Sequence, residues 1–189
     1  MKEVLAAIAA IMTFVAYIPY FRDIIRGKSH PHLYSWGIWG LLTAVIFALQ
    51  IHGHAGPGAF VTLAAGSMCF IVIILSLKYG NRDITFFDTL VLILTIITII
   101  VWLGAKQPRT SAVLGVTADV LAFIPTVRKS WKKPHSETLS LYATNAARFG
   151  IAILALKSYN LLTLLWPATW AVGNSLFSLM LIYRRKLLA

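Results

Sequence analysis

Ala16–Arg22, with the sequence AYIPYFR, returns later in the chain as AFIPTVR at Ala122–Arg128. In both copies a long apolar run ends in an aromatic residue, isoleucine and proline, and a basic turn follows. After each turn a serine, Ser35 or Ser140, stands near the start of the next apolar run. Internal similarity at a fixed spacing predicts an architecture built from repeated units.

The similarity extends to a third apolar run in each half. Thr62, Ala64, Gly66 and Phe70 align with Thr169, Ala171, Gly173 and Phe177. The spacing between the two copies stays between 105 and 107 residues over all three runs. Chance matches between apolar segments do not keep one register over such a length, so we interpret the chain as a duplicated three-helix unit.

The composition indicates a membrane protein. Of the 189 residues, 59% are hydrophobic and only 12% are charged, whereas about a quarter of the residues of a soluble domain are charged. The 17 Lys and Arg residues outnumber the 6 Asp and Glu residues. They fall in short clusters between apolar runs and form no stripe with interleaved aromatic residues, so we expect a lipid bilayer as partner and no nucleic acid.

Seven apolar runs are long enough for membrane spans, because a hydrocarbon core of about 30 Å needs about 20 helical residues. The runs are Val4–Asp23, Pro31–Ile51, Pro57–Lys78, Thr85–Ala105, Arg109–Ser130, Ser136–Lys157 and Leu161–Tyr183. The sequence therefore predicts an all-α integral membrane protein with seven transmembrane helices and no soluble domain.

The runs divide into a first three-helix repeat at residues 1–83, a linker helix at 84–107 and a second repeat at 108–189. Because three is an odd number, only the linker helix lets both repeats enter the membrane in the same direction, related by an axis along the membrane normal. Twelve Lys and Arg residues collect on one side of the membrane and four on the other. The positive-inside rule then predicts an outside N-terminus and a cytoplasmic C-terminus. A prokaryotic inner membrane is favoured, and an organelle membrane is the alternative.

An aromatic-Ile-Pro helix end, a basic turn and a serine at the next helix start, repeated in a 3+1+3 arrangement, resemble the PQ-loop superfamily. The seven-helix SWEET sugar transporters are the most similar branch. At the position of the family's glutamine, after the proline, this chain has Tyr20 and Thr126. The resemblance implies a sugar facilitator, with a substrate-binding asparagine in the last helix.

Polar side chains near the middle of a span are the candidates for a binding site, because a polar group deep in hydrocarbon needs a partner or water. Asn174 is the first candidate, since an amide both donates and accepts hydrogen bonds with a small solute. The alternative role of Asn174 is a bond between helices. The remaining candidates for substrate binding are Ser67, Asn145, Trp39, Trp170 and Thr13.

Asp119 and Arg148 are the two charged residues expected at the same depth, on consecutive helices. One interpretation is a static buried ion pair between those helices. The other is that Asp119 carries a proton, or that Arg148 binds an anionic substrate, and that the pair breaks during transport. Pro19 and Pro125 occupy the same place in both repeats. Proline kinks a helix, so we expect either a pair of hinges or two static kinks.

The sequence contains no catalytic triad, no metal-ligand cluster and no phosphate-binding glycine loop. We therefore expect no enzyme activity, no metal and no cofactor. The leading hypothesis is a SWEET-like sugar facilitator that works by alternating access around a midplane site. One alternative is a proton-coupled carrier of an amino acid or vitamin that uses Asp119 and Arg148. A second alternative is a membrane receptor on the same scaffold. The sequence decides neither the identity of the small-molecule substrate nor whether the chain forms a homo-oligomer.

Overall fold

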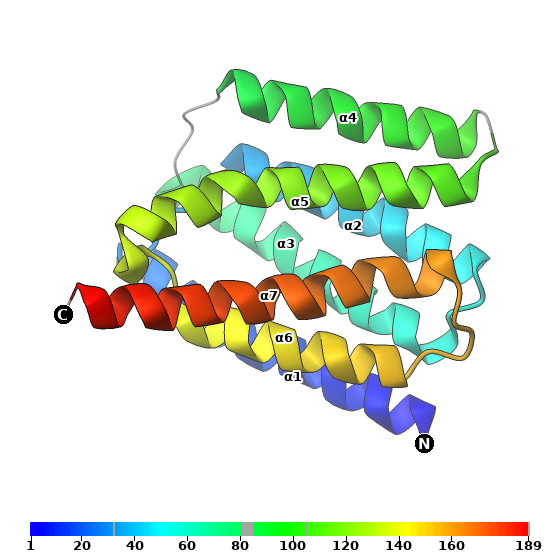
Figure 1. Cartoon of the computed structure of the whole chain (residues 1–189), viewed down its shortest axis with the longest axis horizontal. Coiled ribbons are helices and arrows are strands. Elements are labelled where there is room, and N and C mark those ends of the chain that lie inside the picture. The colour runs from blue at the N-terminus through cyan, green and yellow to red at the C-terminus, as the bar shows by residue number, and fades with distance from the viewer. Residues whose placement is uncertain (32, 81–84, 105, 189) are drawn as a thin grey trace.

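The computed structural model describes residues 1–31, 33–80, 85–104 and 106–188, without the side chains at positions 34, 88, 102, 103 and 125. This part of the chain is all-helical, with seven α-helices and two short 3-10 helices (Figure 1). The α-helices are α1 Lys2–Ile25, α2 Leu33–His52, α3 Ala59–Tyr79, α4 Phe86–Leu103, α5 Pro108–Lys132, α6 Leu139–Leu154 and α7 Leu161–Leu187.

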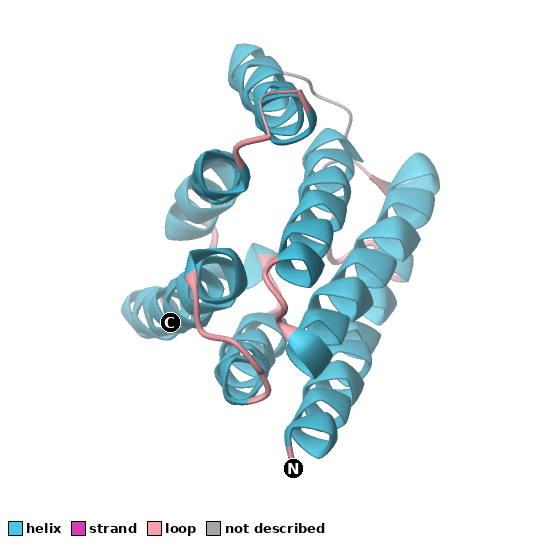
Figure 2. Cartoon of the chain, turned by 90° about the vertical axis from the view of Figure 1, so that its right-hand side faces the viewer, coloured by secondary structure: helices cyan, strands magenta, loops and turns pink. Residues whose placement is uncertain are grey.

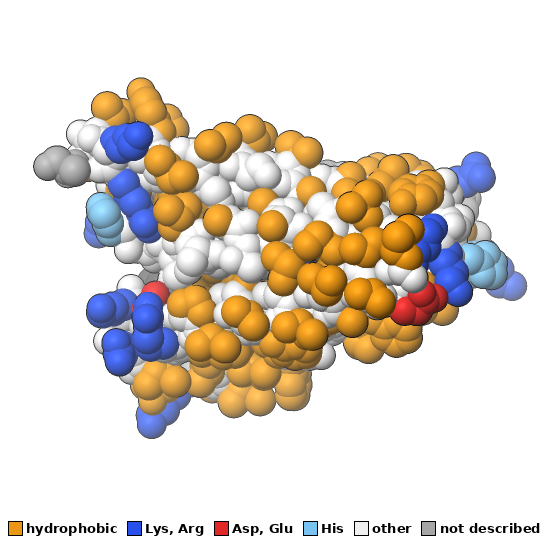
Figure 3. Space-filling view, turned by 90° about the horizontal axis from the view of Figure 1, so that it is seen from below, with side chains coloured by type: hydrophobic (Ala, Val, Ile, Leu, Met, Phe, Trp, Pro, Cys, Tyr) orange, Lys and Arg blue, Asp and Glu red, His pale blue; other side chains and the backbone are white. Residues whose placement is uncertain are grey.

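Five of these helices, α1, α2, α3, α5 and α7, are long and apolar enough to cross a membrane. The described apolar part of α4, Thr89–Val101, and α6 are shorter. A helix that is apolar toward the outside as well as the inside indicates a membrane rather than water around it. Phe14, Ile18, Phe60, Phe70 and Leu176 are exposed on the outer surface. Figure 3 shows apolar side chains along the length of the molecule and Lys and Arg at its two ends.

Helix α6 is shorter than the predicted span Ser136–Lys157 at both ends. Residues Pro134–Ser136 form a 3-10 turn, and Glu137 is extended because its carboxylate is held by two neighbours, as described below. At the other end Ala155 caps the helix, and the Lys157 N–H donates to the Ala55 carbonyl at 2.9 Å instead of continuing it. Apolar composition alone did not reveal these contacts of Glu137 and Lys157.

Six helices form a closed ring in the order α2, α3, α1, α6, α7, α5, in which each helix contacts the next and α5 contacts α2 again. The ring thus runs through α2, α3 and α1 of the first half and then through α6, α7 and α5 of the second half. With α4 left out, both halves follow the order second, third, first helix. Helix α4 lies outside the ring against α5 and α2, at the top of Figures 1 and 2. The Ser111 hydroxyl of α5 donates to the Thr98 carbonyl of α4 at 2.5 Å, which fixes this outer helix.

The first and second halves of the chain are tied together at one end of the ring, here called the basic end, where Arg22, Lys129 and Arg184 lie. The Thr138 hydroxyl before α6 donates to the Asp23 carboxylate of α1 at 2.9 Å. Beside it, Glu137 accepts from Lys129 at 2.5 Å and from the Tyr142 hydroxyl at 2.9 Å. The Thr138–Asp23 bond thus joins the two halves at the basic end, and the bonds of Glu137 hold α5 and α6 of the second half beside it.

The opposite end of the ring is also tied across the halves. The Asn160 side chain caps α7 by accepting from the Leu162 and Thr163 N–H groups, and its amide donates to the Gly53 carbonyl after α2 at 2.9 Å. Gln50 of α2 accepts from the Thr62 hydroxyl of α3 at 2.6 Å. Polar contacts therefore join the two halves at both ends of the ring.

Candidate functional site

A cavity of about 80 Å³ lies inside the ring, lined by residues of α1, α2, α3, α5, α6 and α7 and by no described residue of α4. Twelve of its sixteen lining residues form pairs from the two halves of the chain. Tyr17 and Phe123, Trp36 and Tyr142, Trp39 and Asn145, and Thr43 and Phe149 are each 106 positions apart, and Ala65 and Trp170, and Cys69 and Asn174, are 105 apart. Equivalent helical positions of the two halves therefore face the same cavity.

The remaining lining residues, Asp119, Leu141, Arg148 and Trp166, all belong to the second half. Both charged groups of the cavity are among them, and the two amides, Asn145 and Asn174, are on the same side. The polar groups of the cavity are thus concentrated on α5, α6 and α7.

Asp119 is held by the last helix. Its Oδ2 accepts from Nε1 of Trp166 at 2.7 Å and from Nε1 of Trp170 at 2.5 Å, and the residue is buried. Hydrogen bonds to an ionised acceptor are about twice as strong as neutral ones, and two of them here join α5 to α7. The sequence analysis did not identify Trp166 as a partner of Asp119, although Trp166, Trp170 and Asn174 stand four residues apart and share one helix face.

Arg148 is 2% exposed and lies against its own helix. Its Nε donates to Asn145 Oδ1 at 2.7 Å, and its guanidinium carbon is 4.0 Å from the centre of the Phe149 ring. Among the described residues, Nη1 has no hydrogen-bond partner. None of the ion pairs of the described chain includes Arg148 or Asp119, so the static ion pair considered from the sequence does not form.

Four of the residues expected to bind substrate line the cavity, namely Asn174, Asn145, Trp39 and Trp170. The Asn174 amide nitrogen donates to the Trp170 carbonyl one turn earlier, at 2.7 Å. The indole nitrogen of Trp39 is buried and has no partner in the described part of the chain. The structure therefore brings most of the predicted polar and aromatic set to one place.

Two of the expected residues do not line the cavity. Ser67 is exposed on the outer face of α3, where its hydroxyl donates to the Leu63 carbonyl at 3.0 Å. Ala65 and Cys69 line the cavity from positions two residues to either side, which is about 200° around an α-helix. Thr13 is buried and donates to the Ala9 carbonyl at 2.9 Å.

The structure describes the side chain of Pro19 and not that of Pro125. Helix α1 continues through Pro19, which is partly buried. The side chain of Pro125 lies outside the described residues, and α5 is helical at that position. The hinge interpretation of both prolines stays a prediction.

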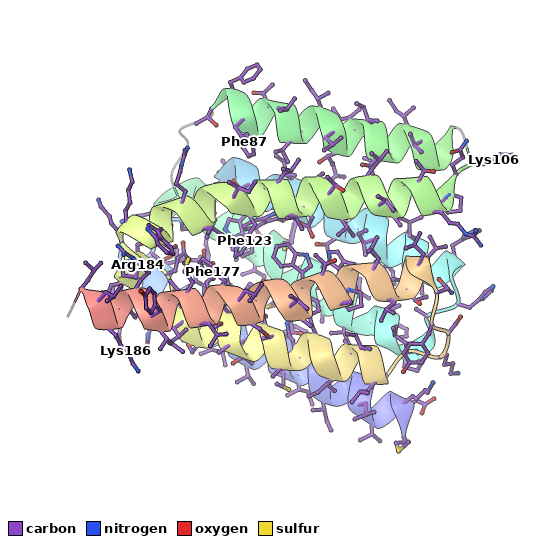
Figure 4. The ribbon with its side chains drawn as sticks, viewed as in Figure 1. Phe87, Lys106, Phe123, Phe177, Arg184 and Lys186 are labelled. Carbon is purple, nitrogen blue, oxygen red and sulfur yellow. The ribbon has the colours of Figure 1, made fainter. Side chains whose placement is uncertain are left out.

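Aromatic rings fill the space between the cavity and the basic end. Phe177, one turn beyond Asn174 on α7, has its ring centre 4.8 Å from that of Phe123 and 4.5 Å from that of Tyr142 (Figure 4). The Trp39 ring links this cluster to the first half, because its centre lies 6.4 Å from that of Phe123 and 5.1 Å from that of Trp36. Tyr142 connects this aromatic cluster to the basic end, because its hydroxyl donates to Glu137.

No family model matches the chain, and comparison with curated proteins and with solved structures likewise finds no match.

Proposed function

We propose that this protein is a membrane carrier that binds a small polar solute in the six-helix cavity and exposes it alternately to the two sides of the membrane. The supporting observation is the cavity itself. It lies between the two halves of the chain, equivalent positions of both halves line it, and amide and charged groups converge on it. A site between two similar bundles is the arrangement that rocking one bundle against the other can open to either side.

The ring order α2–α3–α1 followed by α6–α7–α5 supports two three-helix units with α4 as the linker helix. Each end of the ring is closed by a small number of bonds between these units. At the basic end Thr138 bonds to Asp23, and at the opposite end Asn160 bonds to Gly53 and Lys157 to Ala55. Opening one end requires breaking its bonds while those of the other end persist. Pro19 and Pro125 are the candidate hinges for that motion.

A sugar facilitator is the activity implied by the resemblance to the SWEET transporters. Trp39 and Trp170 offer aromatic faces and Asn145 and Asn174 offer amides, which together suit a solute with hydroxyl groups. A proton-coupled carrier of an ionisable solute is the second candidate. It is favoured by the presence of Asp119 and Arg148 in the cavity without an ion pair between them.

The test is uptake of labelled sugars, amino acids, vitamins and short carboxylic acids into proteoliposomes, with and without an imposed pH gradient. Wild type is compared with Asn174→Ala and Asp119→Asn, and Ser67→Ala is the control because Ser67 is exposed on the outer face of α3, away from the cavity. Loss of uptake in Asn174→Ala and full uptake in Ser67→Ala are expected.

Gradient-driven uptake that disappears in Asp119→Asn would identify the proton-coupled carrier. Gradient-independent uptake that survives in Asp119→Asn would identify the facilitator. Absence of any uptake by folded wild-type protein would reject transport and favour the receptor alternative.

A further inference from the structure

Two buried groups in the cavity wall lack hydrogen-bond partners, and both are donors. Nη1 of Arg148 on α6 and Nε1 of Trp39 on α2 are each buried without a partner among the described residues. Both residues line the cavity, and they belong to opposite halves of the chain. The other two unpartnered buried atoms, the hydroxyl oxygens of Ser130 and Ser178, belong to residues that do not line it. Since buried donors are nearly always paired in folded proteins, a ligand of this cavity has to supply acceptors.

The positive charge of Arg148 also indicates a ligand that supplies acceptors. Arg148 is a permanently charged side chain that is 2% exposed. No carboxylate lies within ion-pair distance of it in the described part of the chain. The carboxylate of Asp119 instead receives the two indole N–H groups of Trp166 and Trp170. A buried cation without a counter-ion is unfavourable, and a negatively charged ligand would compensate it.

We infer that the solute bound here is a small carboxylate, whose oxygens accept hydrogen bonds from Arg148 and Trp39; this assignment rests on the cavity being the site of the carrier proposed above. A carboxylate meets both requirements. It carries the opposite charge, and the spacing of its two acceptor oxygens matches the spacing of the guanidinium donors. A sugar hydroxyl or an amide supplies acceptors without the charge.

The remaining wall determines the rest of the solute. Tyr17, Trp36, Phe123, Leu141 and Phe149 present aromatic and aliphatic surface to the cavity. The volume of about 80 Å³ favours a compact molecule. The ligand chemistry is therefore that of a compact monocarboxylate, whose remainder meets both this apolar surface and the amides of Asn145 and Asn174, and propionate is a suitable probe.

The test is isothermal titration of the full-length chain in detergent with sodium propionate and, separately, with propionamide, at constant ionic strength set by sodium chloride. The two probes have the same carbon skeleton and differ in charge. Propionate is expected to bind at least about 10-fold more tightly than propionamide, because hydrogen bonds to charged groups are worth more than neutral ones. Equal affinities, or no binding of propionate, would overturn the inference.

Two variants locate the binding. Arg148→Gln is expected to weaken propionate binding by about 10- to 100-fold and to leave propionamide nearly unchanged. Trp39→Phe keeps the ring and removes one donor, so it is expected to weaken propionate binding by about 3- to 10-fold. Arg109→Gln, a change at an exposed arginine, is the matched control and is expected to have no effect. If Arg148→Gln does not fold, Trp39→Phe alone decides, and an unchanged affinity there contradicts the assignment.

Comparison with the uptake assay separates this inference from the proposed function. Propionate binding that requires Arg148, in a protein that transports no solute, supports the site and rejects the carrier. Sugar uptake that requires Asn174 and is unaffected by Arg148→Gln, in a protein that does not bind propionate, supports the carrier and rejects the carboxylate.

Discussion

The two walls of the cavity use the same helical positions for different chemistry. The wall from α1, α2 and α3 presents Tyr17, Trp36, Trp39, Thr43, Ala65 and Cys69, none of them a charged side chain at neutral pH. The wall from α5, α6 and α7 presents Asp119, Asn145, Arg148 and Asn174 beside its aromatic rings. The two walls thus use corresponding helical positions, and the charged and amide groups are confined to the wall of the second half. Two sets of three helices can therefore present different chemistry to one cavity from corresponding positions.

Asp119 and its two indole donors, Trp166 and Trp170, show this difference between the two walls most clearly. Thr13 stands 106 positions before Asp119, and Val61 and Ala65 stand 105 positions before Trp166 and Trp170. The carboxylate and both of its donors are therefore absent together from the first half. This is the expected result if a buried carboxylate is tolerated only where donors surround it.

The largest effect is expected from Thr13→Asp, which places a carboxylate in the first half without the indole donors that Asp119 has. The change is expected to lower the free energy of unfolding by about 3–5 kcal/mol, because the charge is buried without a partner. Thermal melting in detergent is the measurement. Thr13→Val is the control, and it loses only the bond to the Ala9 carbonyl. A melting temperature close to that of the control would show that the first half can also hold a carboxylate.

The next effect is expected from Trp170→Phe, which removes one of the two N–H groups that Asp119 accepts. We expect a loss of about 1.5–3 kcal/mol of stability, the range for hydrogen bonds to charged groups. In an Asp119→Asn background the same change should cost less, and a double-mutant cycle measures the difference. Equal costs in both backgrounds would mean that the indole contributes by packing alone.

A smaller effect is expected from Cys69→Asn, which gives the first half the amide that Asn174 gives the second. The new side chain can donate to the Ala65 carbonyl one turn earlier, as Asn174 does to that of Trp170, so we expect a loss of about 1 kcal/mol or less. Thermal melting beside Cys69→Ser checks this. Unfolding of the variant would show that the two walls are not equivalent in shape.

The smallest effect is expected from Ser67→Ala. Because Ser67 bonds only to its own helix on the outer surface, stability should change by less than about 0.5 kcal/mol and solute uptake should not change. Uptake and melting are both measured. A clear loss of uptake would indicate that Ser67 belongs to the binding site and would contradict its position outside the cavity.

The sequence located most of the fold because hydrophobic runs and turn residues are local signals. Predicted spans such as Arg109–Ser130 and the observed helix Pro108–Lys132 differ by only a few residues. The sequence-based span was too long at both ends of α6. The helix begins only after Glu137, and Lys157 lies beyond its other end and donates to the Ala55 carbonyl. The sequence also selected residues that the structure brings together, since Asn174, Asn145, Asp119 and Arg148 are polar residues within apolar runs and all line the cavity.

The alignment of the third and seventh runs shows a further limit. At a spacing of 107 residues Ser67 and Phe70 match Asn174 and Phe177, yet Phe70 is exposed and Phe177 is buried. The cavity positions of the same helices correspond at 105 residues, as Cys69 and Asn174 do. Two residues rotate a helix position by about 200°, so an alignment that is nearly right in sequence selects the wrong face.

By itself the sequence determined that the chain is all-helical and membrane-type, where each apolar run lies and which polar residues fall within those runs, because these properties depend on composition along a short segment. Only the tertiary structure decided which residues meet: that Asp119 is held by Trp166 and Trp170 rather than by Arg148, and that Arg148 and Trp39 each keep a donor in the cavity without a partner among the described residues. Such pairings depend on the rotation and distance of helices far apart in the chain, and no local property of the sequence specifies them.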